Sequence, residues 1–258
     1  LTPDEVEASV TSALQSGYRL IDTANAYVNE KAVGRAIKKS GIDRKEIFLE
    51  TKLWPSFYEQ PDAVDKTLER LDTDYIDLLL IHQAFNDYYG TWRAMEEAYR
   101  AGKVRAIGVS NFYPDRFLDL ALFSEVKPMI DQLETHVFQQ HKADRLFLEK
   151  YGAKLEAWAP FARGENGIFT DPMLVEIGAR HGKTAGQVAL RFLIQSGIPV
   201  IPKSIHKERM VENLNIFDFQ LSAEEMKQVE AMDRGENIFM NHEDAAQIEG
   251  FFARFGVK

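Results

Sequence analysis

Cysteine is absent from the sequence, which excludes disulfide bonds, thiolate zinc sites and cysteine nucleophiles. No apolar run approaches the roughly 18–20 residues of a membrane-spanning helix, and no signal peptide is visible. A Gly-x-Gly-x-x-Gly motif is also lacking, so the dinucleotide fingerprint of a Rossmann domain is missing. We therefore expect a cytoplasmic protein that is not embedded in a membrane and that has no metal site.

Positive charge is the minority sign, and the net charge of −9 argues against nucleic acid or an acidic membrane surface as a partner. The composition is otherwise ordinary for a globular protein, with 45% apolar, 28% charged and 11% aromatic residues. No low-complexity segment or linker divides the 258 residues. We expect one domain over residues 1–258, with a C-terminal tail over about 234–258, and a monomer.

Strand-like apolar segments alternate with helical patterns along the chain. Seven segments have the length and composition of strands: YRLIDT, IFLETKL, YIDLLLIH, VRAIGVSN, PMIDQLE, KLEAWAP and IPVIPKS. A capping box of Thr2 and Glu5, with Pro3 between them, predicts a helix at the start of the chain. Other patterns predict helices over residues 30–39, 61–71, 91–101, 114–123, 142–150, 172–181, 184–195, 207–213 and 222–232. Such alternation is typical of a parallel sheet built from βαβ units.

The number of strands favours an α/β fold of the (β/α)8 barrel type. Seven predicted strands are one short of the eight in such a barrel, and the missing one is the first. A genuinely open barrel would expose two strand edges, near Ile21 and Val200, and unpaired edges promote aggregation. We therefore expect missing residues ahead of Leu1, through truncation or an N-terminal segment outside this sequence, rather than an open barrel.

Polar or aromatic residues stand at the end of every predicted strand. In such barrels the chemistry lies at the carboxyl ends of the strands. The residues at these ends are Asp22, Lys52, His82, Ser110, Asn111, Gln132, Trp158, Lys203 and Ser204. Each has an ordinary structural interpretation on its own, such as a helix cap for Asp22 or a core ring for Trp158. Their regular placement indicates a functional site.

Four of the residues near these ends form a coherent acid–base group. Tyr27 follows Asp22 by five positions, and a phenol with a pKa of about 10 donates protons poorly at neutral pH. The ammonium of Lys52 would lower that pKa, and Asp22 would offset the cost of burying the lysine. His82 could polarise a carbonyl oxygen by hydrogen bonding. This group suits protonation of an oxygen that gains negative charge.

The motifs RLIDTANAY, TKLW, LLLIH, GVSNF and IPKS, followed by KERMVEN, resemble those of the aldo-keto reductases over residues 2–233. The resemblance implies a (β/α)8 barrel and NADPH-dependent reduction of an aldehyde or ketone. It places the catalytic tetrad of that family on Asp22, Tyr27, Lys52 and His82, with Tyr27 as the proton donor. The loop QAFNDYYGTW is similar to that of bacterial diketogluconate, methylglyoxal and prostaglandin-F-type reductases.

The same resemblance implies which residues hold NADPH. Ser110, Asn111 and Gln132 match the group that binds the nicotinamide carboxamide, and Trp158 matches the ring that stacks on the nicotinamide. The 2′-phosphate is assigned to a cationic group after the last strand, where barrels commonly bind phosphate. The full set of cofactor residues is Ser110, Asn111, Gln132, Trp158, Ala159, Pro160, Phe161, Lys203, Ser204, Arg209, Glu212 and Asn213.

Two features depart from the family pattern. The N-terminal hairpin and first strand of the family are missing from this sequence. Gln83 stands where many members have tryptophan, which suggests a polar pocket for small oxygenated substrates such as keto-sugars or dicarbonyls. Trp54 is expected as the apolar pocket wall, and the tail phenylalanines Phe251, Phe252 and Phe255 are candidates to cover the barrel.

Two other functions compete with the reductase interpretation. The superfamily includes channel-associated subunits that bind NADPH and act as sensors, and a complete tetrad does not separate them from enzymes. However, the sequence has no coiled-coil heptad, basic patch or long disordered arm that would mark a partner surface. An unrelated barrel isomerase is disfavoured because no glycine-rich phosphate loop is present.

Overall fold

Six parallel strands form the sheet of the computed structural model, which describes residues 1–58 and 60–256. The strands lie side by side in chain order. They are β1 (Leu20–Asp22), β2 (Phe48–Leu53), β3 (Leu78–Ile81), β4 (Ile107–Ser110), β5 (Ile130–Glu134) and β6 (Lys154–Trp158). Every residue of β3 is buried, as expected for a parallel strand covered on both faces.

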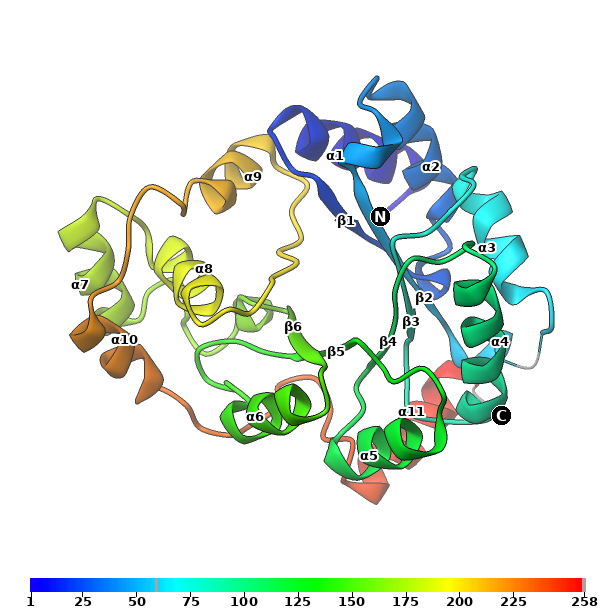
Figure 1. Ribbon diagram of the computed structural model, residues 1–258. Coiled ribbons are helices and arrows are strands. Elements are labelled where there is room, and N and C mark those ends of the chain that lie inside the picture. The colour runs from blue at the N-terminus through cyan, green and yellow to red at the C-terminus, as the bar shows by residue number, and fades with distance from the viewer. Residues whose placement is uncertain (59, 257–258) are drawn as a thin grey trace.

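Helices surround the curled sheet on its outer side (Figure 1). They are α1 (Pro3–Gln15), α2 (Glu30–Lys39), α3 (Ala63–Leu71), α4 (Tyr88–Arg100), α5 (Pro114–Phe123), α6 (Lys142–Lys150), α7 (Pro172–His181), α8 (Ala185–Gln195), α9 (Lys207–Leu214), α10 (Ala223–Glu230) and α11 (Ala245–Phe255). The capping box predicted for the first helix is present, with Thr2 and Glu5 bonded reciprocally. The predicted bounds of α2, α5, α6 and α7 are confirmed, whereas α11 in the tail was not predicted.

The segment predicted as the seventh strand is reduced to a single parallel bridge. Val200 pairs with Ala157 of β6, and two backbone hydrogen bonds support the bridge. The prediction of a full strand over IPVIPKS is wrong, because Pro199 and Pro202 have no N–H group to donate to a ladder. The segment nevertheless runs from α8 along the inner side of the ring toward α9 (Figure 1).

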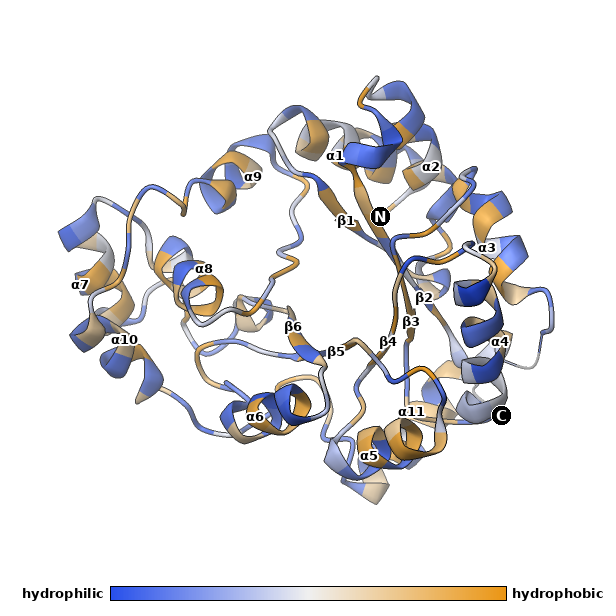
Figure 2. Ribbon diagram, viewed as in Figure 1, coloured by the Kyte–Doolittle hydropathy of each residue, from blue (hydrophilic) through white to orange (hydrophobic). Residues whose placement is uncertain are grey.

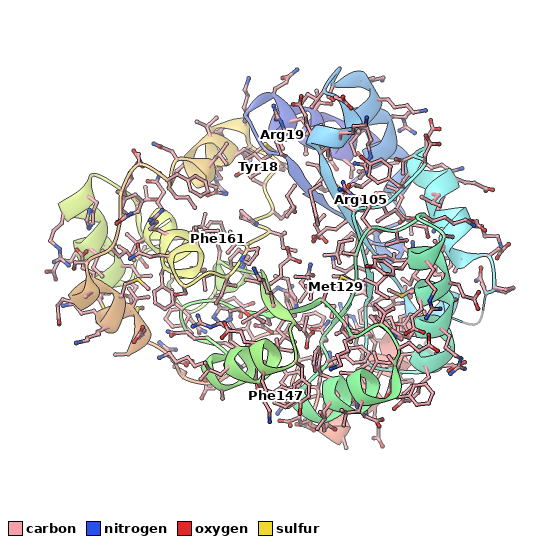
Figure 3. The ribbon with its side chains drawn as sticks, in the orientation of Figure 1. Tyr18, Arg19, Arg105, Met129, Phe147 and Phe161 are labelled. Carbon is pink, nitrogen blue, oxygen red and sulfur yellow. The ribbon has the colours of Figure 1, made fainter. Side chains whose placement is uncertain are left out.

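Near β1, a tyrosine side chain forms a hydrogen bond with the backbone of α9. The hydroxyl of Tyr18 donates to the carbonyl oxygen of Met210 at 3.0 Å, and Figure 3 shows Tyr18 beside that helix. The helices carry their apolar residues toward the sheet and their polar residues outward (Figure 2). Among the described residues, no helix is long and apolar enough to cross a membrane.

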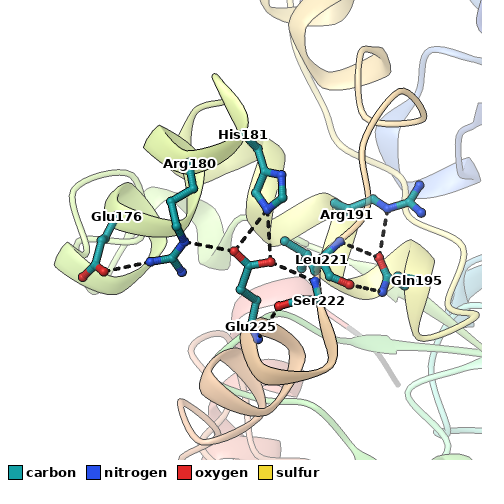
Figure 4. A network of polar contacts seen from close by, with 8 residues as sticks. All are labelled: Glu176, Arg180, His181, Arg191, Gln195, Leu221, Ser222 and Glu225. Atoms are coloured by element: carbon teal, nitrogen blue, oxygen red, sulfur yellow. Dashed lines mark hydrogen bonds and ion pairs between the residues drawn. The ribbon is translucent and has the colours of Figure 1, made fainter.

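Polar contacts join α7, α8 and α10 on the side of the ring away from α3 (Figure 4). Glu225 accepts hydrogen bonds from the backbone of Ser222 at 2.8 Å and from Arg180 at 3.1 Å, and His181 lies 3.0 Å from the same carboxylate. Burial alone would raise the pKa of Glu225, but these hydrogen bonds lower it to about 2.

We expect Glu225→Gln to lower the free energy of unfolding at neutral pH by about 2 kcal/mol, because hydrogen bonds to a charged group are lost. The folded pKa lies below the unfolded value of 4.5, so this stability is present above pH 4.5 and is lost as the pH falls toward about 2. Urea unfolding at several pH values measures both effects. Glu176→Gln is the control, because Glu176 is 76% exposed and contacts the same Arg180. An equal loss in the two variants would contradict the prediction.

Candidate active site

The predicted catalytic residues meet at the carboxyl ends of three adjacent strands. Asp22 is the last residue of β1, Lys52 lies one residue before the end of β2, and His82 directly follows β3. Tyr27 ends a short 3-10 helix, Asn25–Tyr27, that follows β1. Since the strands are parallel and neighbours in the sheet, their ends bring the four side chains to one edge.

Lys52 is held by an ion pair inside this edge. Its ammonium pairs with Asp22 and also donates to the carbonyl oxygen of Thr23 at 3.2 Å. Lys52 is only 1% exposed. Burial by itself would lower the pKa of Lys52, but the neighbouring acidic groups, Asp22 first among them, outweigh burial and raise it. The lysine is therefore a permanent cation at physiological pH.

Tyr27 lies near both this cation and the histidine. The Lys52 ammonium is 5.9 Å from the centre of the Tyr27 ring, and the rings of Tyr27 and His82 are 6.0 Å apart at 89°. Burial raises the pKa of Tyr27, and Lys52 only partly opposes this. The residue as a whole is 50% exposed. The expected lowering by Lys52 is present, but burial outweighs it, so the pKa of Tyr27 is raised and the phenol stays protonated at neutral pH.

His82 is a neutral ring at physiological pH. Burial, and then the charge of Lys52, lower the pKa of His82 well below 6.5. Its Nδ1 atom is buried and has no hydrogen-bond partner among the residues that the structure describes. Trp54 lies edge-on to the ring, with centroids 4.9 Å apart. A neutral imidazole has one N–H group that can donate a hydrogen bond and one nitrogen that can accept one.

The predicted carboxamide-binding residues form a connected polar array on β4 to β6. Ser110 donates to the carbonyl oxygen of Gln132 at 2.9 Å, and the Asn111 amide donates to Ser110 and to the carbonyl oxygen of His82, each at 3.1 Å. The indole of Trp158 donates to Asn111 at 3.1 Å. The structure therefore joins the cofactor candidates directly to the catalytic edge.

The Gln132 side chain donates hydrogen bonds to two carboxyl groups that were not among the predicted site residues. Its amide nitrogen lies 3.0 Å from Glu50 and 3.0 Å from Glu156. Both glutamates stand two residues before a predicted site residue, Lys52 and Trp158 respectively. Residues two apart on a strand share one face, so this spacing was the signal that could have revealed them.

The remaining cofactor candidates lie on the loop after β6 and around α9. Ala159 has a positive φ of 50°, Pro160 is buried, and Phe161 packs on Phe169 with centroids 5.3 Å apart. Figure 3 shows Phe161 on the side of the ring toward α8.

At α9, two exposed cations stand near the helix start. Lys203 precedes α9, Arg209 lies in its first turn, and Ser204 accepts the backbone N–H of His206 at 3.1 Å. Glu212 accepts the hydroxyl of Thr184 at 2.7 Å, and Asn213 is half-buried. In the described part of the chain, no group of histidine, aspartate and glutamate side chains is arranged to hold a metal ion.

The family model described as "Aldo/keto reductase family" matches residues 1–234. The chain belongs to this family. Glyoxal reductase of Bacillus subtilis is 42% identical over 245 residues, which cover 93% of this chain and 88% of that protein. Methylglyoxal reductase DkgA of Escherichia coli K12 is 35% identical over 239 residues, 91% of this chain and 87% of that protein.

Solved structures of aldo-keto reductases share the fold. The Bombyx mori aldo-keto reductase, solved in complex with NADP, superposes with a TM-score of 0.88 at 33% identity, covering 95% of this chain and 87% of that one. An aldo/keto reductase from Brucella melitensis gives a TM-score of 0.86 at 42% identity over 90% of this chain and 91% of that one. The predicted fold class and the family resemblance are confirmed.

In this aldo/keto reductase Gln83 anchors the C-terminal tail. It is 3% exposed, and its side-chain oxygen lies 2.9 Å from Nε2 of His242. The His242 ring is stacked between Phe85 and Tyr113. The side-chain oxygen of Gln83 is therefore paired with the tail.

The tail helix α11 packs against Trp54 and Phe85. The ring centroids of Phe251 and Phe255 lie 5.6 and 5.7 Å from that of Trp54. The ring centroid of Phe252 lies 5.1 Å from that of Phe85. Upstream of this helix, the backbone N–H groups of residues 238 and 239 donate to Glu134 at the end of β5. The tail is thus attached to the ends of β2, β3 and β5, the same edge that carries the candidate catalytic residues.

We expect His242→Ala to loosen this attachment. The substitution leaves the buried Gln83 oxygen unpaired, at a cost of about 1–3 kcal/mol. Hydrogen exchange should rise over residues 238–256, and KM for a carbonyl substrate should rise while NADPH affinity is unchanged. The exposed His206 supplies the control His206→Ala, which should leave tail exchange unchanged. Unaltered tail exchange in His242→Ala would contradict the prediction.

The attachment should also weaken in acid. Burial lowers the pKa of His242 from 6.5 to about 4. Between these two values the unfolded chain binds a proton that the folded chain does not, so this contribution to stability falls as the pH falls.

Proposed function

We propose that this protein reduces a small aldehyde or ketone to the alcohol with NADPH, with Tyr27 as the proton donor. The observation that carries the proposal is the convergence of a protonated phenol, a buried lysine–aspartate ion pair and a neutral histidine at one edge of the sheet. Membership of the aldo/keto reductase family supports it.

Each catalytic residue has a role that follows from its charge state. His82 is neutral, so an N–H group of its ring can orient the substrate oxygen by donating a hydrogen bond. Tyr27 keeps its proton until negative charge develops on that oxygen and then donates it. The permanent charge of Lys52 stabilises the phenolate that remains, and Asp22 fixes the position of the lysine.

The residues that would hold the cofactor fit a nicotinamide dinucleotide. Trp158 and Asn111 are linked beside His82, and Lys203 and Arg209 present two exposed cations at α9. When bound, NADPH supplies the hydride that reaches the carbonyl carbon. We assign the nicotinamide to Ser110, Asn111, Gln132, Trp158, Ala159, Pro160 and Phe161, and the phosphate and adenine to Lys203, Ser204, Arg209, Glu212 and Asn213.

Small dicarbonyls are the proposed substrate class. Two relatives are named glyoxal reductase and methylglyoxal reductase. The tail and Trp54 provide an aromatic wall next to His82, which favours a compact substrate. Because the tail is anchored on the ends of the strands, we also propose that residues 1–258 form one domain.

NADPH consumption by the purified protein, with a panel of small aldehydes, dicarbonyls and keto-sugars, tests the function. Turnover with dicarbonyls is the expected result. NADPH binding without turnover on any substrate would overturn the enzyme proposal and favour a sensor or regulatory subunit.

A further inference from the structure

Two buried carboxyl groups lie inside the barrel next to the catalytic ion pair and have no part in the proposed chemistry. Glu50 is 0% exposed and Glu156 is 3% exposed. The register places Glu50 opposite Asp22, and Glu156 opposite Gln132. The Gln132 amide bonds both glutamates, so a continuous polar chain crosses the interior from β1 to β6.

Charge balance requires a proton in this chain. The ammonium of Lys52 already neutralises Asp22, and two further carboxylates would leave uncompensated negative charge in a buried place, which is costly. The Oε2 atom of Glu50 has no hydrogen-bond partner in the described part of the chain. The charged carboxyls that act on it, Asp22 and Glu156, can only accept. A proton on one of them would supply the missing donor.

The electrostatic surroundings of Glu50 and Glu156 also favour a bound proton. Burial, followed by the charges of Glu156 and Asp22, raises the pKa of Glu50 well above its usual range. Burial raises the pKa of Glu156 to about 7, although the hydrogen bond from Gln132 acts to lower it. The charged groups that face Glu156 are Asp22 on β1 and Glu50 and Lys52 on β2, and its partner on β5 is the neutral Gln132.

We propose that Glu50 and Glu156 hold a proton between them and act as positioning residues for the catalytic edge. Through Asp22 they keep the ion pair of Lys52 in place, and through Gln132 they orient an amide assigned to the cofactor. The catalytic consequence rests on the proposed reductase function, whereas the held proton does not.

Loss of this proton should slow carbonyl reduction. A second negative charge beside Asp22 would compete for the ammonium of Lys52. It would make the phenol of Tyr27 a weaker acid, because negative charge at Glu50 and Asp22 already raises the pKa of Tyr27. The rate kcat should therefore fall as the pair ionises. Glu156→Gln keeps the shape of the side chain and cannot ionise, so the fall of kcat with rising pH should be absent in this variant.

Infrared titration of the cofactor-free protein tests the held proton without any turnover. Asp131→Asn is the background, because Asp131 is a buried carboxyl on β5 whose pKa burial also raises, so it would give a protonated band of its own. In this background the band of a protonated carboxyl should persist where ordinary carboxyls, with a pKa of about 4, are ionised. The band should be lost or shifted when Glu156→Gln or Glu50→Gln is added.

The outcomes separate this proposal from the proposed function. Absence of such a band in the Asp131→Asn background overturns the held proton, even if the glutamine variants do not fold. A band that both variants leave unchanged also overturns it. A band lost in the variants of a protein that reduces no carbonyl would support the pair and contradict the reductase. Turnover whose pH dependence is unchanged by Glu156→Gln would overturn the positioning role.

Discussion

The Tyr27→Phe variant should lose about 100- to 10,000-fold of kcat for carbonyl reduction, the range that a general acid contributes. The Tyr27 ring lies 5.9 Å from the Lys52 ammonium and 6.0 Å from the neutral His82 ring, measured to the ring centres. Phenylalanine keeps the ring contacts and removes only the proton. NADPH affinity should change little, because the hydroxyl acts mainly in the transition state.

Single-turnover rates and NADPH fluorescence titration measure the two quantities separately. Tyr99→Phe is the control, because Tyr99 is a partly buried tyrosine of α4 that packs against the core. It should retain wild-type kcat. Turnover within a few-fold of the wild type in Tyr27→Phe would exclude Tyr27 as the proton donor.

Removal of the cations at α9 should abolish the preference for NADPH over NADH. Lys203 and Arg209 are both exposed at the start of this helix, where a phosphate would be stabilised by charge and by free backbone N–H groups. Loss of one charged hydrogen bond costs about 1.5–3 kcal/mol. Arg209→Ala should therefore weaken NADPH binding roughly 10- to 100-fold, and Lys203→Ala should have the same direction of effect.

Calorimetric titration with NADPH and NADH measures the discrimination directly. Affinity for NADH should be unchanged, since it lacks the 2′-phosphate. Lys207→Ala removes an exposed cation from the first position of the same helix and serves as the control. If all three variants discriminate as the wild type does, the phosphate is bound elsewhere.

Much of the fold was predictable because parallel strands covered on both faces read as unbroken apolar runs. Strand β3, with its sequence LLLI, illustrates this. The first helix was predictable for another reason, its capping box. The prediction of the last strand was wrong for a reason that is visible in the sequence. Its two prolines have no N–H group to donate to a strand ladder. Helix α11 was missed because its apolar face has no partner until Trp54 and Phe85 are brought to it by the barrel.

The candidate site was predictable in part for a similar reason. Residues at strand ends, such as Asp22 and Lys52, meet whenever the strands are parallel and adjacent. Glu50 and Glu156 were overlooked because only the last residues of each strand were considered, although each lies two positions before a predicted site residue and so shares its face.

The sequence by itself determined the order of strands and helices and which side chains reach the carboxyl edge, because apolar periodicity and strand length are local properties. Only the tertiary structure decided the charge states and the covering of the site. The phenol of Tyr27 is less acidic than its lysine neighbour suggested, because burial outweighs that charge. Gln83 binds a tail histidine 159 positions away. Burial and pairing of this kind arise between distant segments, and packing alone brings them together.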